Sequence, residues 1–150
     1  EIYTLSLHDA LPISSWPTDG STFASEEVER ATKLLSDDGE VIILSVASKL
    51  TATTFQSKKE IEKVNRAMYE EAEGYVNSMA ELFDEDMPVT KKVIVGFPAE
   101  VICEFAEEED IDLIIISASG KSGFHKLIIG SVAEKVLKTT QKDVLLVHGN

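Results

Sequence analysis

A loop rich in glycine and serine is the stretch of this sequence best suited to chemistry, because its residues could hold a phosphate group. It lies between the apolar run Leu113–Ile116 and a helical pattern over Ser131–Thr139. The first N–H groups of a helix have no partner within the helix, and the helix dipole favours an anion at that end. Gly120 and Gly130 would let the backbone come close to a ligand, and Lys121 would add a positive charge. The same spacing also fits an ordinary loop between a buried strand and the last helix.

The elements that must position this loop alternate between strand and helix, which predicts a parallel sheet with helices on both faces. After a weak first strand before Pro17, the predicted strands are Val41–Val46, Val89–Val95, Leu113–Ile116 and Val144–Val147. The first predicted helix comes after a turn at Pro17–Ser21, and its apolar positions are Ala24, Val28, Ala31, Leu34 and Leu35. The other predicted helices cover about Lys58–Phe83, about Pro98–Glu108, and Ser131–Thr139. The long helix has an apolar stripe that we expect to face the core, made of Ile61, Val64, Met68, Ala72, Tyr75, Met79 and Leu82. The pair Lys91-Lys92 predicts that the third strand lies at an edge of the sheet.

The glycine-rich loop resembles the nucleotide loop of the universal stress protein family, whose ATP-binding members carry Gly-x2-Gly-x9-Gly-(Ser/Thr). Gly120, nine further residues and Gly130-Ser131 match the second half of this motif, and Ser117 stands where the family has its first glycine. The resemblance covers roughly residues 16–148 in the family's order, and its other matching segments are Pro17–Ser21, Val41–Val46, Gly96-Phe97-Pro98 and Val144–Val147.

The resemblance implies a three-layer α/β/α fold of the Rossmann-like, adenine nucleotide alpha hydrolase-like type, with five parallel strands in the order 3-2-1-4-5. The first and fourth strands are then neighbours at a topological switch point, where open α/β sheets bind ligands. The turn with Asp19 and the loop with Gly120 would face each other there. The residues that the resemblance places around the nucleotide are Pro17, Thr18, Asp19, Val46, Ser117, Gly120, Lys121, Gly130, Ser131 and Val132.

Two of these residues have structural alternatives that the sequence leaves open. Asp19 would lie near the adenosine end of the ligand, but it could also be a helix cap. Val46 would offer apolar surface to adenine, but it could also be plain core.

The function that the resemblance implies is that of a cytoplasmic, homodimeric regulatory protein that binds ATP, with Mg²⁺ held through the phosphates, and acts as a stress-response switch. The dimer would form through the last strand, Val144–Val147, which otherwise leaves an apolar edge exposed. The alternative is a dimeric interaction module of the same fold that has lost the nucleotide, as Ser117 suggests. We do not expect an enzyme, because the sequence offers no Ser/His/Asp set, metal-ligand spacing or Gly-x4-Gly-Lys-Ser/Thr loop. Slow ATP hydrolysis is a third, less favoured hypothesis.

Composition limits the partners. The formal net charge of −13 argues against broad binding to nucleic acid or to an anionic membrane, and no apolar run has the length of a membrane span. Cys103 is the single cysteine, so no disulfide can form within the chain, which fits a reducing cytoplasm. It lies in an apolar helical pattern and is expected to be a core thiol.

The first residues stand apart from the rest. Residues 1–13 resemble the in-frame translation of a sequencing-library adapter, so we predict an artefactual segment there and a single domain over residues 14–150. The sequence before Pro17 is also a poor central strand, because Pro12 lacks a ladder donor and Ser14 and Ser15 bury little apolar surface. We therefore expect the original first strand to be partly overwritten.

Overall fold

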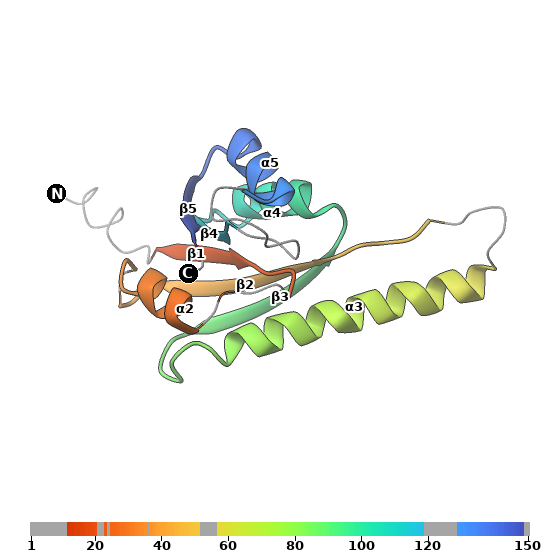
Figure 1. Ribbon diagram of the computed structural model, residues 1–150, viewed down its shortest axis with the longest axis horizontal. Coiled ribbons are helices and arrows are strands. Elements are labelled where there is room, and N and C mark those ends of the chain that lie inside the picture. The colour runs from red at the N-terminus through yellow and green to blue at the C-terminus, as the bar shows by residue number, and fades with distance from the viewer. Residues whose placement is uncertain are drawn as a thin grey trace, which may run out of the picture.

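The computed structural model describes residues 12–20, 23, 25–35, 37–51, 57–118 and 129–148 (Figure 1). Strands and helices alternate along these residues as the sequence predicts. Their order is β1 (Ile13–Pro17), α2 (Ser25–Thr32), β2 (Glu40–Ala47), α3 (Lys58–Ala80), β3 (Val89–Val95), α4 (Pro98–Glu108), β4 (Leu113–Ser117), α5 (Ser131–Thr139) and β5 (Asp143–Val147).

The five strands form one parallel sheet in the order β3-β2-β1-β4-β5, which confirms the predicted fold class. β3 is an edge strand, and its residues Thr90, Lys91 and Lys92 are exposed, as the lysine pair predicts. β5 is the opposite edge. Among the described strands it has no neighbour on its outer side, so it offers a row of backbone groups to a further strand.

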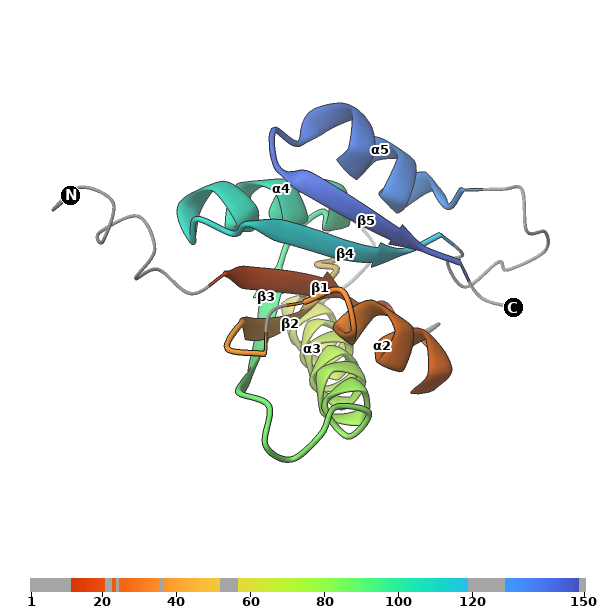
Figure 2. The ribbon, with the colours of Figure 1, turned by 90° about the vertical axis from the view of Figure 1, so that its left-hand side faces the viewer.

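Helices cover both faces of the sheet because successive strand residues point to opposite sides. Ile42 and Leu44 of β2 pack into a core cluster with α4 and α5, whereas Val41 and Ile43 pack into a second cluster with α2 and α3. Figure 2 shows these two pairs of helices on opposite sides of the sheet. The unbroken apolar runs in the sequence are thus strands that are buried on both faces.

β1 lies at the centre of the sheet although its sequence is polar. Ser14, Ser15 and Trp16 are all buried. The Trp16 ring packs against Phe23 and Phe83 at centroid distances of 5.5 and 4.9 Å, and its Nε1 donates a hydrogen bond of 2.9 Å to Ser14 Oγ. Aromatic burial by Trp16 thus supplies much of the apolar surface that the serines lack.

β1 also begins one residue before the predicted domain boundary. The N–H of Ile13 donates to Asp112 Oδ2 at 2.7 Å, and its carbonyl accepts from the N–H of Asp112 at 2.9 Å. Ile13 therefore belongs to the sheet, while residues 1–11 lie outside the described part of the chain.

Two apolar positions of the predicted helices are exposed. α2 ends at Thr32, so Leu34 lies in the following turn and is 70% exposed. Val64 is expected to face the core but is 37% exposed, whereas Ile61, Ala72 and Met79 of the same predicted stripe are buried, as is Val76. Helical periodicity shows which face is apolar, but it cannot show how far the helix stays in contact with the sheet.

Candidate functional site

β1 and β4 separate toward their carboxyl ends, where the two predicted ligand loops begin. Only Ser14↔Leu113 and Ser15↔Ile114 are registered pairs between these two strands. β1 continues its pairing with β2 as far as Pro17, and β4 continues with β5 as far as Ser117. The chain then leaves toward α2 on one face and toward α5 on the other. This is the switch-point arrangement at which open parallel sheets bind ligands.

The turn after β1 holds Asp19 at this edge of the sheet. The N–H of Thr18 donates to the Leu44 carbonyl at 2.8 Å, so Thr18 extends the ladder with β2 and is buried. The N–H of Gly20 donates to Thr18 Oγ1 at 3.2 Å, and Gly20 has φ +80°, a conformation that favours glycine. Asp19 lies between these two anchored residues and is exposed. Its carboxylate is therefore presented at the carboxyl edge.

α3 contributes a residue to this turn that sequence reasoning did not assign to the site. The Tyr75 ring lies against Gly20, and its hydroxyl donates a hydrogen bond to Glu71. The sequence placed Tyr75 on the apolar stripe of α3, but no local signal pairs it with a turn more than fifty residues earlier.

The glycine-rich loop starts and returns at one point of the sheet. The N–H of Ala118 donates to the Val147 carbonyl at 2.9 Å, and the N–H of Gly130 donates to the Ala118 carbonyl at 2.8 Å. Ser117, the last residue of β4, is half-buried. The predicted ligand residues Gly120 and Lys121 lie outside the described residues.

α5 begins at this closure with an N-cap that has no side chain. Gly130 is the N-cap, with φ −60° and ψ 152°, so no side chain at the cap satisfies the first N–H groups of the helix. Ser131 follows and is exposed. Glu134 also lies in the first turn, but Lys138 binds its carboxylate at 2.6 Å and lowers its pKa. A helix start with uncapped donors and a neutralised carboxylate suits an anion.

Two half-buried valines lie on the α4/α5 face of the sheet. Val46, near the end of β2, and Val132, in the first turn of α5, both pack against the same core cluster. Their partial burial agrees with a core role and with a role as apolar lining for a flat ring. Both roles of Val46 thus remain predictions.

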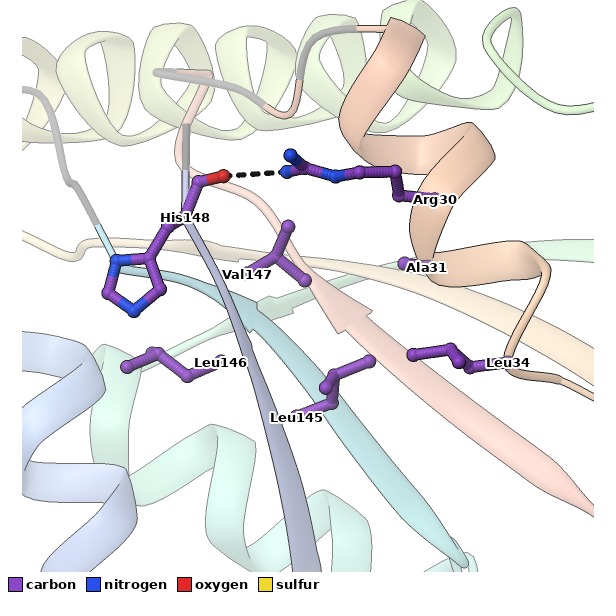
Figure 3. Close-up of a pocket in the computed structure, with 7 residues that line it drawn as sticks. All are labelled: Arg30, Ala31, Leu34, Leu145, Leu146, Val147 and His148. Carbon is purple, nitrogen blue, oxygen red and sulfur yellow. Dashed lines mark hydrogen bonds between the residues drawn. The ribbon is translucent and has the colours of Figure 1, made fainter. Parts of the chain in front are cut away.

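A concave surface lies along the edge strand β5, where residues of α2 face it (Figure 3). Its volume is about 480 Å³, and its lining includes Leu34, Leu145 and Val147. The Leu34 and Leu145 side chains point toward one another in Figure 3. Arg30 Nη2 donates to the carbonyl of His148 at 2.7 Å, which ties α2 to the end of β5.

The described residues lack a metal cluster and a membrane-spanning helix. These residues contain no group of three or more His, Cys, Asp or Glu side chains that could hold a metal ion. None of the helices they form combines the length and the apolar character needed to cross a membrane.

Comparison with known proteins identifies the same architecture. The universal stress protein MJ0531 of Methanocaldococcus jannaschii is 29% identical over 133 residues, which are 87% of this chain and 78% of that protein. The solved structure of MJ0577 from the same organism superposes with a TM-score of 0.69 at 26% identity and covers 92% of this chain and 96% of that one. A universal stress protein family structure from Arabidopsis thaliana with AMP bound superposes with a TM-score of 0.57 at 16% identity and covers 93% and 92% of the two chains, so it shows the shared fold.

The family model itself matches almost the whole described domain. It is described as the universal stress protein family, and it covers residues 16–148, from the central strand to the end of β5. Together with the sheet order and the two loops at its switch point, this match shows that the chain belongs to the universal stress protein family.

Proposed function

We propose that this protein binds an adenine nucleotide, ATP with Mg²⁺, at the carboxyl ends of β1 and β4 and acts as a dimeric regulatory switch. The observation that carries the proposal is the closure of the glycine-rich loop on Ala118, which sets the uncapped start of α5 at the switch point. The Asp19 turn lies at the end of the neighbouring strand. The AMP-bound family structure from Arabidopsis thaliana supports an adenine nucleotide as the ligand class.

Each group of residues would have its own part in binding. The N–H groups and hydroxyl at Ser131 and Val132 would hold phosphate, with Gly130 allowing close approach. Asp19 would bind at the adenosine end, and Val46 would lie against the base. Gly120 and Lys121 are assigned to the ligand site only because they match the family motif. Mg²⁺ would be carried by the phosphate oxygens and would offset their charge.

The main alternative is an interaction module that no longer binds nucleotide. The observation behind it is Ser117, which ends β4 half-buried where ATP-binding relatives have glycine. A Cβ and hydroxyl at this position could fill space that a phosphate or ribose needs. The two functions predict different effects of Ser117→Gly on nucleotide binding.

Equilibrium binding of a fluorescent ATP analogue tests the proposal directly. Saturable binding with a Kd below about 1 mM is expected, and Asp19→Ala should weaken it, whereas Asp86→Ala, in an exposed turn before β3, should not. A failure to saturate for the unchanged protein rejects the nucleotide function. If Ser117→Gly then creates binding, the fold retains the site and Ser117 blocks it; if Ser117→Gly also fails to bind, the interaction module is favoured.

We also propose that the homodimer forms through the edge strand β5. Its apolar residues Val144, Leu145 and Leu146 are only partly covered within one chain, and a second strand would satisfy the open backbone row. Leu145→Asp should shift the protein toward monomer in sedimentation experiments. Leu137→Asp, on an exposed position of α5, is the matched control and should leave the association state unchanged.

We propose binding rather than turnover as the function of the bound nucleotide. Phosphate release from ATP should therefore be slow, since any such reaction would depend on positioning and Mg²⁺ alone. Release that is equally fast after Lys121→Ala and Gly130→Ala would indicate a contaminating activity.

A further inference from the structure

The ring of Tyr75, on α3, lies across the turn that presents Asp19 at the carboxyl edge of the sheet. A Cβ on Gly20 would overlap three atoms of this ring, Cε1, Cδ1 and Cζ. One whole side of the ring, rather than the tip of a flexible side chain, therefore covers the α-carbon of Gly20. The ring and the turn exclude any side chain from the space between them.

This ring belongs to a part of α3 that is fixed to the sheet. Ala72, Val76 and Met79 are the buried residues around it on the helix, and Val76 and Met79 pack in the core cluster that α2 and α3 share. The Tyr75 hydroxyl donates a hydrogen bond to Glu71, one helical turn earlier, which restricts rotation of the half-buried ring. A residue on a packed helix holds its contact partner more firmly than a residue on a loop does.

Gly20 needs a restraint of this kind. Glycine has the widest backbone freedom of any residue, so it does not hold a turn in one conformation by itself. The N–H of Thr18 donates to the Leu44 carbonyl at 2.8 Å and fixes the first side of the turn to β2. The N–H of Gly20 donates back to Thr18 Oγ1 at 3.2 Å, so this bond closes the turn on itself. The Tyr75 ring fixes the Gly20 side of the turn to a separate element.

The direction of the Asp19 carboxylate depends on both of these anchors. Asp19 is the residue between Thr18 and Gly20, and it is exposed. If Gly20 were free to change its backbone angles, the carboxylate would take up several directions in the free protein. Binding is weaker when the groups that bind must first be ordered. A ring that limits Gly20 thus orients Asp19 before a ligand arrives.

We propose that Tyr75 is a positioning residue of the nucleotide site, which acts through Gly20 to hold Asp19 toward the adenosine end of the ligand. This inference rests on the nucleotide function proposed above. It gives α3 a part in ligand binding, although none of the residues assigned to the site belongs to that helix. The ring is the part of Tyr75 that matters, because it occupies the space above Gly20, whereas the hydroxyl orients the ring through Glu71.

Equilibrium binding of the fluorescent ATP analogue to the full chain, with Mg²⁺ present, tests this role. Tyr75→Ala should raise the Kd about tenfold, which is the effect of leaving about one residue to be ordered on binding. Tyr75→Phe keeps the ring over Gly20 and should change the Kd by less than about twofold. Tyr69→Ala, at a position of the same helix that is 39% exposed, is the matched control and should not change the Kd. A Tyr75→Ala protein that binds as tightly as the unchanged protein would overturn the proposal.

A double-mutant cycle with Asp19 separates positioning from a general structural role. In a protein that already carries Asp19→Ala, the change Tyr75→Ala should have little further effect on the Kd, because the carboxylate that the ring positions is gone. An equal loss with and without Asp19 would overturn the proposal, since Tyr75 would then support the fold rather than Asp19. Should circular dichroism show Tyr75→Ala to be unfolded, Tyr75→Leu takes its place with the same expected results, because leucine keeps apolar volume without the flat ring.

Hydrogen exchange of the Gly20 N–H in the ligand-free protein tests the contact without nucleotide. Exchange should be about tenfold faster in Tyr75→Ala than in the unchanged protein and the same in Tyr75→Phe. Equal exchange in Tyr75→Ala would reject the positioning role even if the ATP analogue binds. Faster exchange in Tyr75→Ala, together with no saturable binding by the unchanged protein, would reject the nucleotide function and with it the role of Tyr75 in binding, but not the contact between the ring and the turn.

Discussion

The ring of Tyr75 packs directly over the α-carbon of Gly20. A Cβ on residue 20 would lie 2.3 Å from Cε1 of Tyr75, a separation that real Cβ atoms do not adopt. Gly20 also has φ +80°. Two independent features therefore require glycine at this turn, and α3 takes part in fixing the loop that presents Asp19.

Gly20→Ala is expected to destabilise the protein by about 1–3 kcal/mol, since it adds a left-handed alanine and an overlap with the tyrosine ring. Urea unfolding measures the loss. Gly74→Ala is the matched control, because a Cβ at Gly74 in α3 meets nothing within 4 Å; it should stabilise by about 0.5–1 kcal/mol. Adding Tyr75→Ala to Gly20→Ala should recover the part due to overlap, and strictly additive effects would show that the ring does not constrain the turn.

Ser15→Ala is expected to stabilise the protein by about 1 kcal/mol. Ser15 is fully buried in β1, and its Oγ has no hydrogen-bond partner within the described structure, so the change removes an unsatisfied polar atom. Ser14→Ala is the contrasting variant. It deletes the acceptor of Trp16 Nε1 and should cost about 1–2 kcal/mol. Thermal unfolding of both variants decides the matter, and a loss of stability in Ser15→Ala would mean that its hydroxyl is satisfied in solution.

Cys103 gives a pH prediction at the alkaline end. Burial raises the pKa of its thiol, and Glu107 and Glu104 raise it further. The folded protein therefore keeps the thiol proton to a higher pH than the unfolded chain does. The contribution of the protonated thiol to the free energy of unfolding is complete below the pKa of the unfolded chain, about 8.5, and is lost as the pH rises toward the pKa of the folded protein. Urea unfolding between pH 7 and pH 10 should show this decline, and Cys103→Ala should make it shallower. A slope that is the same in both proteins would contradict the prediction.

The start of α3 gives the opposite pH prediction. Ser57 and Glu60 form a capping box, in which Ser57 Oγ accepts from the Glu60 N–H at 3.2 Å and the Ser57 N–H donates to Glu60 Oε2 at 3.0 Å. Hydrogen bonds from the Ser57 backbone and side chain lower the pKa of Glu60. The capping contribution is therefore present above the unfolded pKa of about 4.3 and is lost as pH falls below it.

Hydrogen exchange in the first turn of α3 measures this cap. Ser57→Ala should speed exchange there by an amount that corresponds to about 1 kcal/mol. Relative to the intrinsic exchange rate at each pH, the protection lost on acidification in the unchanged protein should be smaller in Ser57→Ala. Unchanged exchange in the variant would show that the cap does not form in solution.

The sequence predicted the elements with strong local patterns. The apolar runs of β2 and β4, the helix α4 that starts at a proline and the helix α5 that starts at a serine each have a local cause, and their bounds agree with the structure to within one residue. The sheet order came from the resemblance to the family, and the structure confirms it. The ligand residues on β1, β2 and α5 were named from the same resemblance, and their role in binding stays a prediction.

The sequence by itself thus determined which segments are strands and helices, because period-2 and period-3.6 patterns are properties of neighbouring residues. Only the tertiary structure decided that Ser14, Ser15 and Trp16 form the central strand, that Leu34 and Val64 are exposed, and that Tyr75 meets Gly20. These features depend on residues tens of positions apart, and the burial of a side chain depends on which distant element covers it. No local pattern contains that information.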